Sequence, residues 1–248
     1  MIEISDLHVR YTGSNCSAVE KVTTTIGHPT FTAVMGPNGA GKTALARCLN
    51  ALITPTSGKV VVDGLNTNDP ASRSGIRRLV GMVFSDPNLQ ITSVSVEREL
   101  AFGLQNLAIP TDEIHARINE HLRLFGLEHL RSVPPLTLSG GEKQRLAIAA
   151  VTILRPRYLI LDEATSLLGA SSRRAIMQLI LEMKQQLGFG LVLITQFPTE
   201  ALKAERLIVM HQGNVLMDDT PSAIFTRTRE LMEIGVPVPV RSRLMELL

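Results

Sequence analysis

Tryptophan is absent from the 248-residue sequence, and aromatic residues make up only 4% of it. Proteins that bind single-stranded nucleic acid stack bases on aromatic side chains, so this scarcity argues against such a surface. An excess of positive charge is also missing, because 25 lysine and arginine residues face 23 aspartate and glutamate residues, for a net charge of +2. We therefore expect no nucleic-acid partner.

Cysteine is scarce as well, with Cys16 and Cys48 as the only two. They lack the CxxC spacing, so they make neither a disulfide framework nor a zinc site, and we expect two buried, reduced thiols. The six histidines show no ligand spacing and no pairing with a nucleophile. We expect all of them at the surface or in turns.

Long apolar runs are missing too: no stretch reaches the roughly 18 residues that a membrane-spanning helix needs. The N-terminal residues Met1–Asp6 contain acids where a secretory signal peptide has basic residues and then an apolar run. The sequence thus predicts neither a membrane span nor a secretory leader.

Short apolar runs are present, and several alternate with helical patterns, which predicts an α/β fold with a mainly parallel sheet. Residues 1–30 alternate apolar and polar side chains instead, as an antiparallel edge layer does. The pattern from Asp86 to Arg157 is mostly helical, and its clearest helix begins after Pro110-Thr111 and ends at Gly126. The expected buried strands are Thr30–Met35, Val60–Val62, Leu79–Phe84, Tyr158–Leu161, Leu191–Thr195 and Leu207–Met210.

One segment fits the pattern G-x-x-x-x-G-K-[ST], namely Gly36, Pro37, Asn38, Gly39, Ala40, Gly41, Lys42 and Thr43. It follows an expected strand and opens an expected helix, which is the context that a phosphate-binding loop requires. Backbone N–H groups and the positive helix end hold phosphates in such loops. We expect Lys42 to reach the β- and γ-phosphates and the Thr43 hydroxyl to bind Mg²⁺. A glycine-rich turn without a ligand is the alternative.

The apolar run Tyr158–Leu161 ends in two acids, Asp162 and Glu163. A buried strand that ends in carboxylates carries their charge to the sheet edge at which such folds bind ligands. We expect Asp162 to orient the Mg²⁺ shell and Glu163 to polarise an attacking water as general base. A solvated strand end is the alternative.

The segment Leu138–Arg145 has the sequence LSGGEKQR. Ser139 followed three residues later by Glu142 is typical of a capping box, which alone would explain the start of a helix. A cap does not need the two successive glycines, Gly140 and Gly141. These glycines would expose backbone N–H groups at a positive helix end, as a phosphate contact requires.

Taken in the order in which they occur along the chain, the three segments resemble the nucleotide-binding subunits of ABC transporters, and the match covers nearly the whole chain. The segment Leu138–Arg145 matches the signature of that family and is the most specific part. The resemblance implies a P-loop core, an N-terminal antiparallel β layer and a helical lobe that carries the signature. It also implies that two subunits enclose two ATP molecules with Mg²⁺, each between one phosphate loop and the other subunit's signature. Tyr11 lies where the family's adenine-stacking aromatic lies, with a surface tyrosine as the alternative.

The segments Val83–Gln90 and Val96–Gly103, and the tail with Pro237 and Pro239, resemble the ATPase subunits of energy-coupling factor (ECF) transporters. This resemblance implies a second, non-identical ATPase subunit and integral membrane subunits as partners, at the cytoplasmic face of the cell membrane. It implies an ABC-type ATPase domain over residues 1–228, with a helical lobe at about 86–157. A short helical tail over residues 229–248 would follow.

Three catalytic-loop positions depart from the family pattern: Ser85 replaces a glutamine, Gly169 an aspartate and Gln196 a histidine. Serine is too short to reach both Mg²⁺ and the attacking water, and an amide can donate to a γ-phosphate but cannot carry a proton. Gln90 follows Ser85 by five residues, and we do not assign the missing role to it. Ala44 replaces a hydroxyl residue, a loss of about 0.5–1.5 kcal/mol.

Since the phosphate loop, the signature and both strand-end acids are intact, we expect a subunit that holds ATP, hydrolyses it slowly and pairs with a complete, different subunit. A homodimer in which Glu163 suffices is one alternative. A non-hydrolytic ATP-binding gating subunit is another, from a different functional class. A soluble relative in DNA repair, ribosome work or cofactor assembly is a third, against which the single cassette and the ECF-like segments argue.

Overall fold

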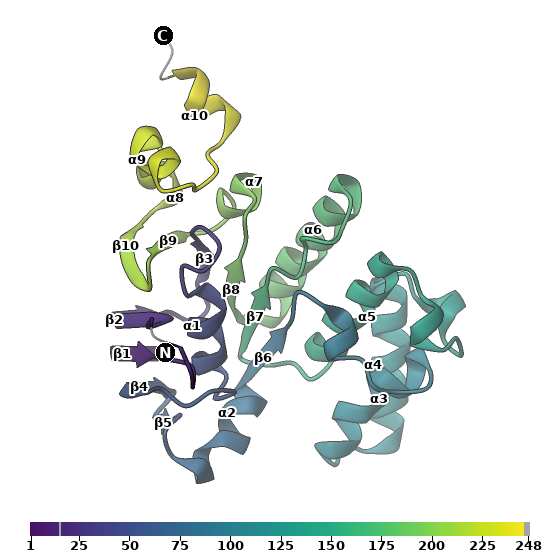
Figure 1. The fold of residues 1–248 in the computed structure, drawn as a ribbon. Coiled ribbons are helices and arrows are strands. Elements are labelled where there is room, and N and C mark those ends of the chain that lie inside the picture. The colour runs from purple at the N-terminus through teal and green to yellow at the C-terminus, as the bar shows by residue number, and fades with distance from the viewer. Residues whose placement is uncertain (15, 246–248) are drawn as a thin grey trace. The chain divides into compact units, whose positions relative to one another are not determined.

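The chain divides into two compact units in the computed structural model, which describes residues 1–14 and 16–245. Unit 1 combines Met1–Val80 with Gly190–Leu248, and unit 2 is the intervening segment Gly81–Phe189 (Figure 1). Within the described residues, no helix has both the length and the apolar character needed to cross a lipid bilayer.

Unit 1 contains an antiparallel sheet with the strand order β2-β1-β4-β5. In it β1 (Ile2–Val9) pairs with β2 (Val19–Ile26) and with β4 (Ser57–Val62), and β4 pairs with the short β5 (Leu65–Asn66). Buried and exposed residues largely alternate along β1 and β2, because one face of the sheet covers the core. The expected antiparallel layer is confirmed.

Four strands of unit 1 form part of a second, mainly parallel sheet, in the order β10-β9-β3-β8. The central strand β3 (Phe31–Met35) runs parallel to β8 (Gly190–Ile194) and β9 (Arg206–His211), while β10 (Asn214–Asp219) is antiparallel to β9. Every residue of β3 and β8 is buried, as continuous apolar runs require in a sheet covered on both faces. The helices of this unit are α1 (Lys42–Leu49), α2 (Arg73–Leu79), α7 (Pro198–Ala201), α8 (Pro221–Ile224), α9 (Thr228–Glu233) and α10 (Val240–Met245), with a 3-10 turn at Pro70–Ser72.

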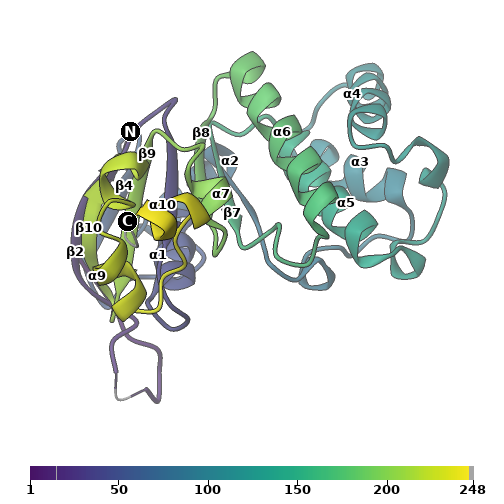
Figure 2. The ribbon, with the colours of Figure 1, turned by 90° about the horizontal axis from the view of Figure 1, so that it is seen from above.

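Unit 2 contains the neighbouring strands β6 (Val80–Val83, whose first residue belongs to unit 1) and β7 (Tyr158–Asp162). Its helices are α3 (Val96–Asn106), α4 (Thr111–Leu124), α5 (Gly140–Thr152) and α6 (Ala170–Leu187), with 3-10 turns at Pro87–Leu89, Glu128–Leu130 and Pro135–Thr137. Helix α3 packs against both α4 and α5, and the three lie together in Figure 1 and Figure 2. The helix expected between Pro110 and Gly126 is confirmed as α4, and Gly126 has the positive φ of 62° that is typical just after a helix.

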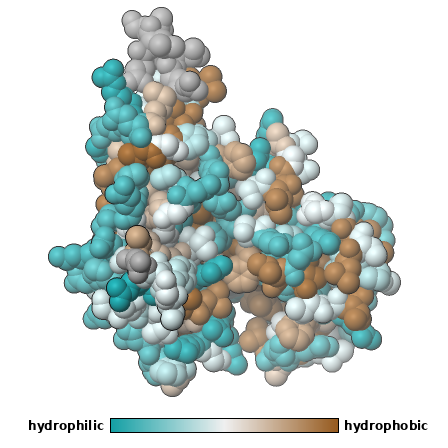
Figure 3. Space-filling view, in the orientation of Figure 1, coloured by the Kyte–Doolittle hydropathy of each residue, from teal (hydrophilic) through white to brown (hydrophobic). Residues whose placement is uncertain are grey.

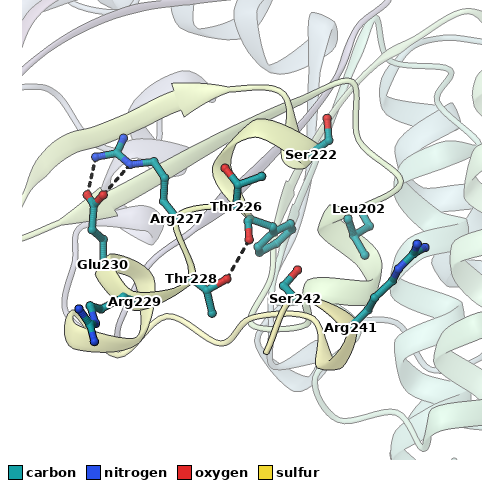
Figure 4. A pocket seen from close by; sticks show the side chains of 10 residues that line it. Leu202, Ser222, Thr226, Arg227, Thr228, Arg229, Glu230, Arg241 and Ser242 are labelled. Atoms are coloured by element: carbon teal, nitrogen blue, oxygen red, sulfur yellow. Dashed lines mark hydrogen bonds and ion pairs between the residues drawn. The ribbon is translucent and has the colours of Figure 1, made fainter. Parts of the chain in front are cut away.

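The C-terminal part of unit 1 has an open pocket of about 820 Å³ beside α9, shown in Figure 4. Its lining combines hydroxyl and charged side chains with Leu202 and Phe225, and Arg227 forms an ion pair with Glu230 there. The two short helices around the Pro237–Pro239 turn agree with the expected tail, whose last residues, 246–248, lie outside the described part of the chain. The division into residues 1–228 and 229–248 stays a prediction.

Two expectations about burial are wrong. Cys16 is exposed, in the loop that joins β1 to β2 and projects from unit 1 in Figure 2, whereas Cys48 is buried in α1. His121 is also buried, at 2% exposure, and stacks on Phe125 with ring centroids 6.1 Å apart. Burial lowers the pKa of His121, because the charged imidazolium loses its hydration.

The two thiols should therefore react at very different rates with a thiol-specific reagent such as Ellman's. Both cysteines are free, but burial raises the pKa of Cys48 to about 12. At about pH 8 almost none of Cys48 is then thiolate, the reactive form. We expect one rapid equivalent from the native protein and a second only after unfolding, with Cys16→Ser abolishing the rapid one. Two rapid equivalents would contradict the burial of Cys48.

Candidate functional site

The expected phosphate loop lies between the end of β3 and the start of α1, in unit 1. Gly41 is the N-cap of α1 with φ 97°, and a Cβ there would lie 2.1 Å from the Ala18 carbonyl oxygen. A Cβ at Gly36 would lie 2.2 Å from the Met210 carbonyl oxygen. Larger residues at either position would force the backbone apart, so these glycines hold the loop close to its neighbours.

Lys42 is only 5% exposed, although it is charged. Its Nζ donates hydrogen bonds to the carbonyl oxygens of Gly36, at 2.8 Å, and Pro37, at 3.0 Å. The ammonium is thus held at the loop, next to the N-terminal N–H groups of α1. Thr43 is half-buried, Ala40 is buried, and Asn38 and Gly39 are exposed. Together these groups form a positively polarised cradle of the kind that binds phosphates.

Gln196, which follows β8 after Thr195, lies beside this loop. Its side chain is exposed, and Nε2 donates to Oδ1 of Asn38 over 3.5 Å, which is a weak hydrogen bond. The two residues are 158 positions apart in the chain, so the fold of unit 1 brings them together. An amide donor therefore lies at the phosphate loop, where the sequence predicted one.

Tyr11 lies in the loop between β1 and β2 and is 43% exposed. Its carbonyl oxygen accepts a hydrogen bond from the Ser14 backbone N–H at 3.0 Å. A turn held in this way leaves the ring accessible for stacking. Its role in adenine binding stays a prediction.

The two strand-end acids lie in unit 2, at the end of β7. All five residues of β7 are buried, and Asp162 is 3% exposed. Glu163 follows with φ 51°, a left-handed conformation that costs a side-chain-bearing residue about 1–3 kcal/mol and is often retained at functional sites. No group of three or more His, Cys, Asp or Glu side chains in the described residues could hold a metal ion. Mg²⁺ does not need such a group, because it is commonly bound by one or two protein side chains with phosphates and water.

The signature segment opens α5 with the expected capping box. The Ser139 backbone N–H and hydroxyl both donate to Oε2 of Glu142, at 2.8 Å and 2.6 Å, and the Glu142 N–H donates back to the Ser139 Oγ. The bond from the hydroxyl, and then that from the backbone, lower the pKa of Glu142. The capping interpretation is therefore correct, but it concerns only Ser139 and Glu142.

Nothing within unit 2 requires the two glycines of the signature. Neither Gly140 nor Gly141 has a positive φ. A Cβ at Gly140 would meet no atom within 4 Å, and one at Gly141 would lie 3.7 Å from Cδ2 of Leu168, an ordinary contact. Ser139, Gly141 and Glu142 line a cavity of about 530 Å³, together with Arg123 and Arg145 among others. Gly141, which has no side chain, therefore presents its backbone to a cavity that is lined in part by arginine side chains.

The other two catalytic-loop departures, Ser85 and Gly169, lie at open positions, whereas Ala44 is buried in α1. Ser85 is exposed, and Gly169 is an exposed N-cap of α6 around which a Cβ would meet no atom within 4 Å. Gln90 is used within its own loop, since its Oε1 accepts from the Phe84 N–H at 3.2 Å and its Nε2 donates to the Met82 carbonyl at 3.4 Å. This use of its amide agrees with leaving the missing role of residue 85 unassigned.

One pair of residues near the phosphate loop was not found from the sequence. Thr195 and Glu200, on either side of the turn that carries Gln196, are 1% and 4% exposed and hydrogen-bonded to each other. Thr195 falls at the end of the expected buried strand Leu191–Thr195, but an acid in the first turn of a short helix ordinarily indicates a surface position. The only sequence signal for Glu200 was its closeness to Gln196.

Comparison with known proteins agrees with this geometry. Residues 19–166 match the family model described as ABC transporter. The energy-coupling factor transporter ATP-binding protein EcfA1 of Clostridium perfringens is 37% identical over 243 residues, covering 96% of this chain and 86% of that protein.

Two solved structures have similar folds. The structure of cbiO1 from Clostridium perfringens, described as part of the ABC transporter complex cbiONQ, superposes with a TM-score of 0.83 and 31% identity, covering 99% of this chain and 98% of that one. The ATP-binding cassette MJ0796, a dimer in a post-hydrolysis state with ADP and Pi, gives a TM-score of 0.83 and 28% identity, with 89% and 99% covered. These neighbours confirm the expected fold class, a P-loop core with an antiparallel β layer and a helical lobe. The chain therefore belongs to the ABC transporter family, together with the ATP-binding proteins of energy-coupling factor transporters.

Proposed function

We propose that this chain is the ATP-binding subunit of an ECF-type importer and that it binds and hydrolyses ATP to drive uptake. The observation that carries the proposal is the buried Lys42, held at a glycine loop at the N-terminus of α1. The two carbonyl oxygens fix the ammonium at the loop, and the loop and the start of α1 present backbone N–H groups that can bind an anion. The names of the relatives supply the transporter class.

The proposed roles follow from the chemistry of each side chain. Lys42 and the backbone of Gly36–Thr43 bind the phosphates, and Tyr11 stacks on adenine. The Thr43 hydroxyl is a ligand for Mg²⁺, and the Asp162 carboxylate orients its shell. Bound Mg²⁺ neutralises charge that develops on the phosphates. Glu163 accepts the proton of the attacking water, and Gln196 donates a hydrogen bond to the γ-phosphate.

The signature of this chain serves a second ATPase subunit in the proposal. Ser139, Gly140, Gly141 and Glu142 would approach the nucleotide that the other subunit holds. The support is that no packing or backbone requirement within unit 2 explains two adjacent glycines. Bare backbone N–H groups at the start of a 13-residue helix suit an approaching phosphate.

Membrane subunits are the further partners, at the cytoplasmic face of the membrane. Large apolar side chains are exposed in unit 2, and Figure 3 shows apolar residues gathered over its helices. The exposed large apolar side chains of unit 2 include Leu89, Val94, Phe102 and Leu136, which are 73%, 67%, 54% and 86% exposed. Surfaces of this kind are ordinarily covered by a protein partner or a membrane.

We further propose that the chain is the slow member of a pair of non-identical ATPase subunits. Ser85, Gly169 and Gln196 replace three side chains that act on hydrolysis, while the binding residues are intact. The loss of one transition-state donor costs about 10²–10³ in rate. A gating subunit that binds ATP without hydrolysing it is the second candidate, favoured by the same replacements.

A single-turnover assay with radiolabelled ATP tests this proposal. We compare the chain with the triple variant Ser85→Gln/Gly169→Asp/Gln196→His, whose substitutions fall at exposed positions. The variant should hydrolyse ATP about 10²-fold faster or more, with similar affinity for ATP. Equal rates would contradict slow hydrolysis caused by these loops. Bound ATP with no phosphate release from the wild type would favour the gating subunit.

The composition of the native complex tests the pairing. Isolation of the complex through a tag on this chain should recover a second, different ATPase subunit and membrane proteins. A complex with two copies of this chain and no other ATPase would contradict the heterodimer.

A further inference from the structure

A buried carboxyl group follows the turn that carries Gln196. Glu200, in α7, is 4% exposed, and its Oε2 accepts a hydrogen bond from the hydroxyl of Thr195, which is 1% exposed. Among the residues that the structure describes, Oε1 of Glu200 has no hydrogen-bond partner. Only one of the two carboxyl oxygens therefore has a hydrogen bond within the described residues.

The bonds of these two residues fix the turn on both sides of Gln196. The Thr195 backbone N–H donates to the Val34 carbonyl at 3.2 Å, which ties the start of the turn to β3. The Phe197 N–H donates to Oγ1 of Thr195 at 3.0 Å, and the Glu200 N–H donates to the Phe197 carbonyl at 3.0 Å. Gln196 itself is exposed and reaches Asn38 of the phosphate loop.

The chemistry of one hydroxyl explains why the carboxylate matters. A threonine hydroxyl has a single proton to donate and two lone pairs to accept with. Because the hydroxyl donates its hydrogen bond to Glu200, the lone pairs of Oγ1 are left to accept from the Phe197 N–H. Without the carboxyl group the hydroxyl can rotate toward another acceptor, and its hydrogen bond from the Phe197 N–H is then no longer held in place.

Stability alone does not account for an acid at this position. A buried polar group with an oxygen that makes no hydrogen bond is destabilising relative to an apolar side chain of similar size. Buried polar groups that are incompletely satisfied in native proteins often belong to functional sites. Glu200 is linked through Thr195 to the turn that carries Gln196, the residue proposed to donate a hydrogen bond to the γ-phosphate.

We infer that Glu200 is a positioning residue for hydrolysis, which holds the Thr195 hydroxyl so that the turn presents the Gln196 amide at the phosphate loop. The inference rests on the proposed role of Gln196. Glu200 contacts neither the nucleotide nor the attacking water in this arrangement. Its effect on the reaction passes through Gln196 alone.

Three variants separate this role from a general loss of stability. Glu200→Ala removes the acceptor, and Glu200→Gln keeps an acceptor oxygen for the Thr195 hydroxyl. Thr228→Val is the matched control, because Thr228 is a buried threonine of the same unit (4% exposed) whose hydroxyl donates to the Phe225 carbonyl. Thermal unfolding of each variant confirms that it is folded.

Amide hydrogen exchange measures the turn directly, without any need for turnover. In Glu200→Ala, exchange of residues 195–201 should accelerate about tenfold, the loss expected for one buried hydrogen bond. The same segment should exchange at the wild-type rate in Glu200→Gln and in Thr228→Val. Wild-type exchange in Glu200→Ala would overturn the inference.

A double-mutant cycle then links the turn to the reaction. In single-turnover assays Glu200→Ala should lower the rate about tenfold with little change in the Kd for ATP, and Glu200→Gln should restore it. In a Gln196→Ala background, Glu200→Ala should have no further effect, because the two residues act in series. An additive effect would overturn the inference. If Gln196→Ala alone leaves the rate unchanged, the proposed role of Gln196 fails, while the exchange data still decide whether Glu200 fixes the turn.

Discussion

Lys42→Ala is expected to weaken ATP binding by about 10- to 100-fold. Each hydrogen bond from a charged donor contributes about 1.5–3 kcal/mol, and the ammonium is held where it can reach phosphate oxygens. Alanine removes the charge and leaves the glycine backbone of the loop in place. Isothermal titration with ATP and Mg²⁺ measures the change.

Lys59→Ala is the matched control for this variant. Lys59 is exposed on β4 of the same unit and has no place in the proposed site. The Lys59→Ala protein should bind ATP with the affinity of the wild type. Equal affinities of Lys42→Ala and Lys59→Ala would show that the loop does not hold phosphates in the way proposed.

Glu163→Gln is expected to lower the single-turnover rate about 10²-fold or more while ATP binding is retained. Glutamine has the shape of glutamate, but its amide accepts no proton from the attacking water. The backbone at this position is left-handed, with φ 51°, and the substitution leaves the number of side-chain atoms on this backbone unchanged. Rapid mixing with radiolabelled ATP gives the rate, and titration gives the affinity.

Glu182→Gln is the control for that measurement. Glu182 is an exposed glutamate of α6 in the same unit, hydrogen-bonded to Gln178. The rate in this variant should match the wild type. A Glu163→Gln protein that hydrolyses ATP as fast as Glu182→Gln would remove Glu163 from the role of general base.

The two main variants separate binding from chemistry. Lys42→Ala should lose affinity, whereas Glu163→Gln should keep it and lose turnover. The gating alternative predicts a different result, in which Glu163→Gln has nothing to lower because the wild type releases no phosphate. The pair of measurements therefore distinguishes a slow ATPase from an ATP-binding gate.

Features that depend on consecutive residues were predictable from the sequence. The loop between β3 and α1, the capping box of Ser139 with Glu142 and the acids that end β7 are all encoded within a few positions. Local geometry decides such features, because each residue's neighbours in the chain are also its neighbours in space. The antiparallel layer followed in the same way from alternation along β1 and β2.

Burial of individual side chains was predicted less well. Cys16 was expected inside and is exposed, and His121 was expected outside and is buried. Residue type gives only an average tendency, whereas burial depends on what the rest of the fold places over a side chain. For His121 one such neighbour is Phe125, the C-cap residue of the same helix, so a part of the signal was present in the sequence.

Short patterns with fixed spacing could be read from the sequence: the family resemblance, the glycine-rich loop at residues 36–43, the LSGGEKQR segment and the acids after Leu161. The contact of Gln196 with Asn38 across 158 positions became visible only in the fold, as did the buried pair of Glu200 and Thr195. Gln196 and Asn38 meet because the parallel strands β8 and β3 bring the loops that follow them to one edge of the sheet. The buried pair depends on the sheet and α7 excluding water from a polar group, which no local pattern records.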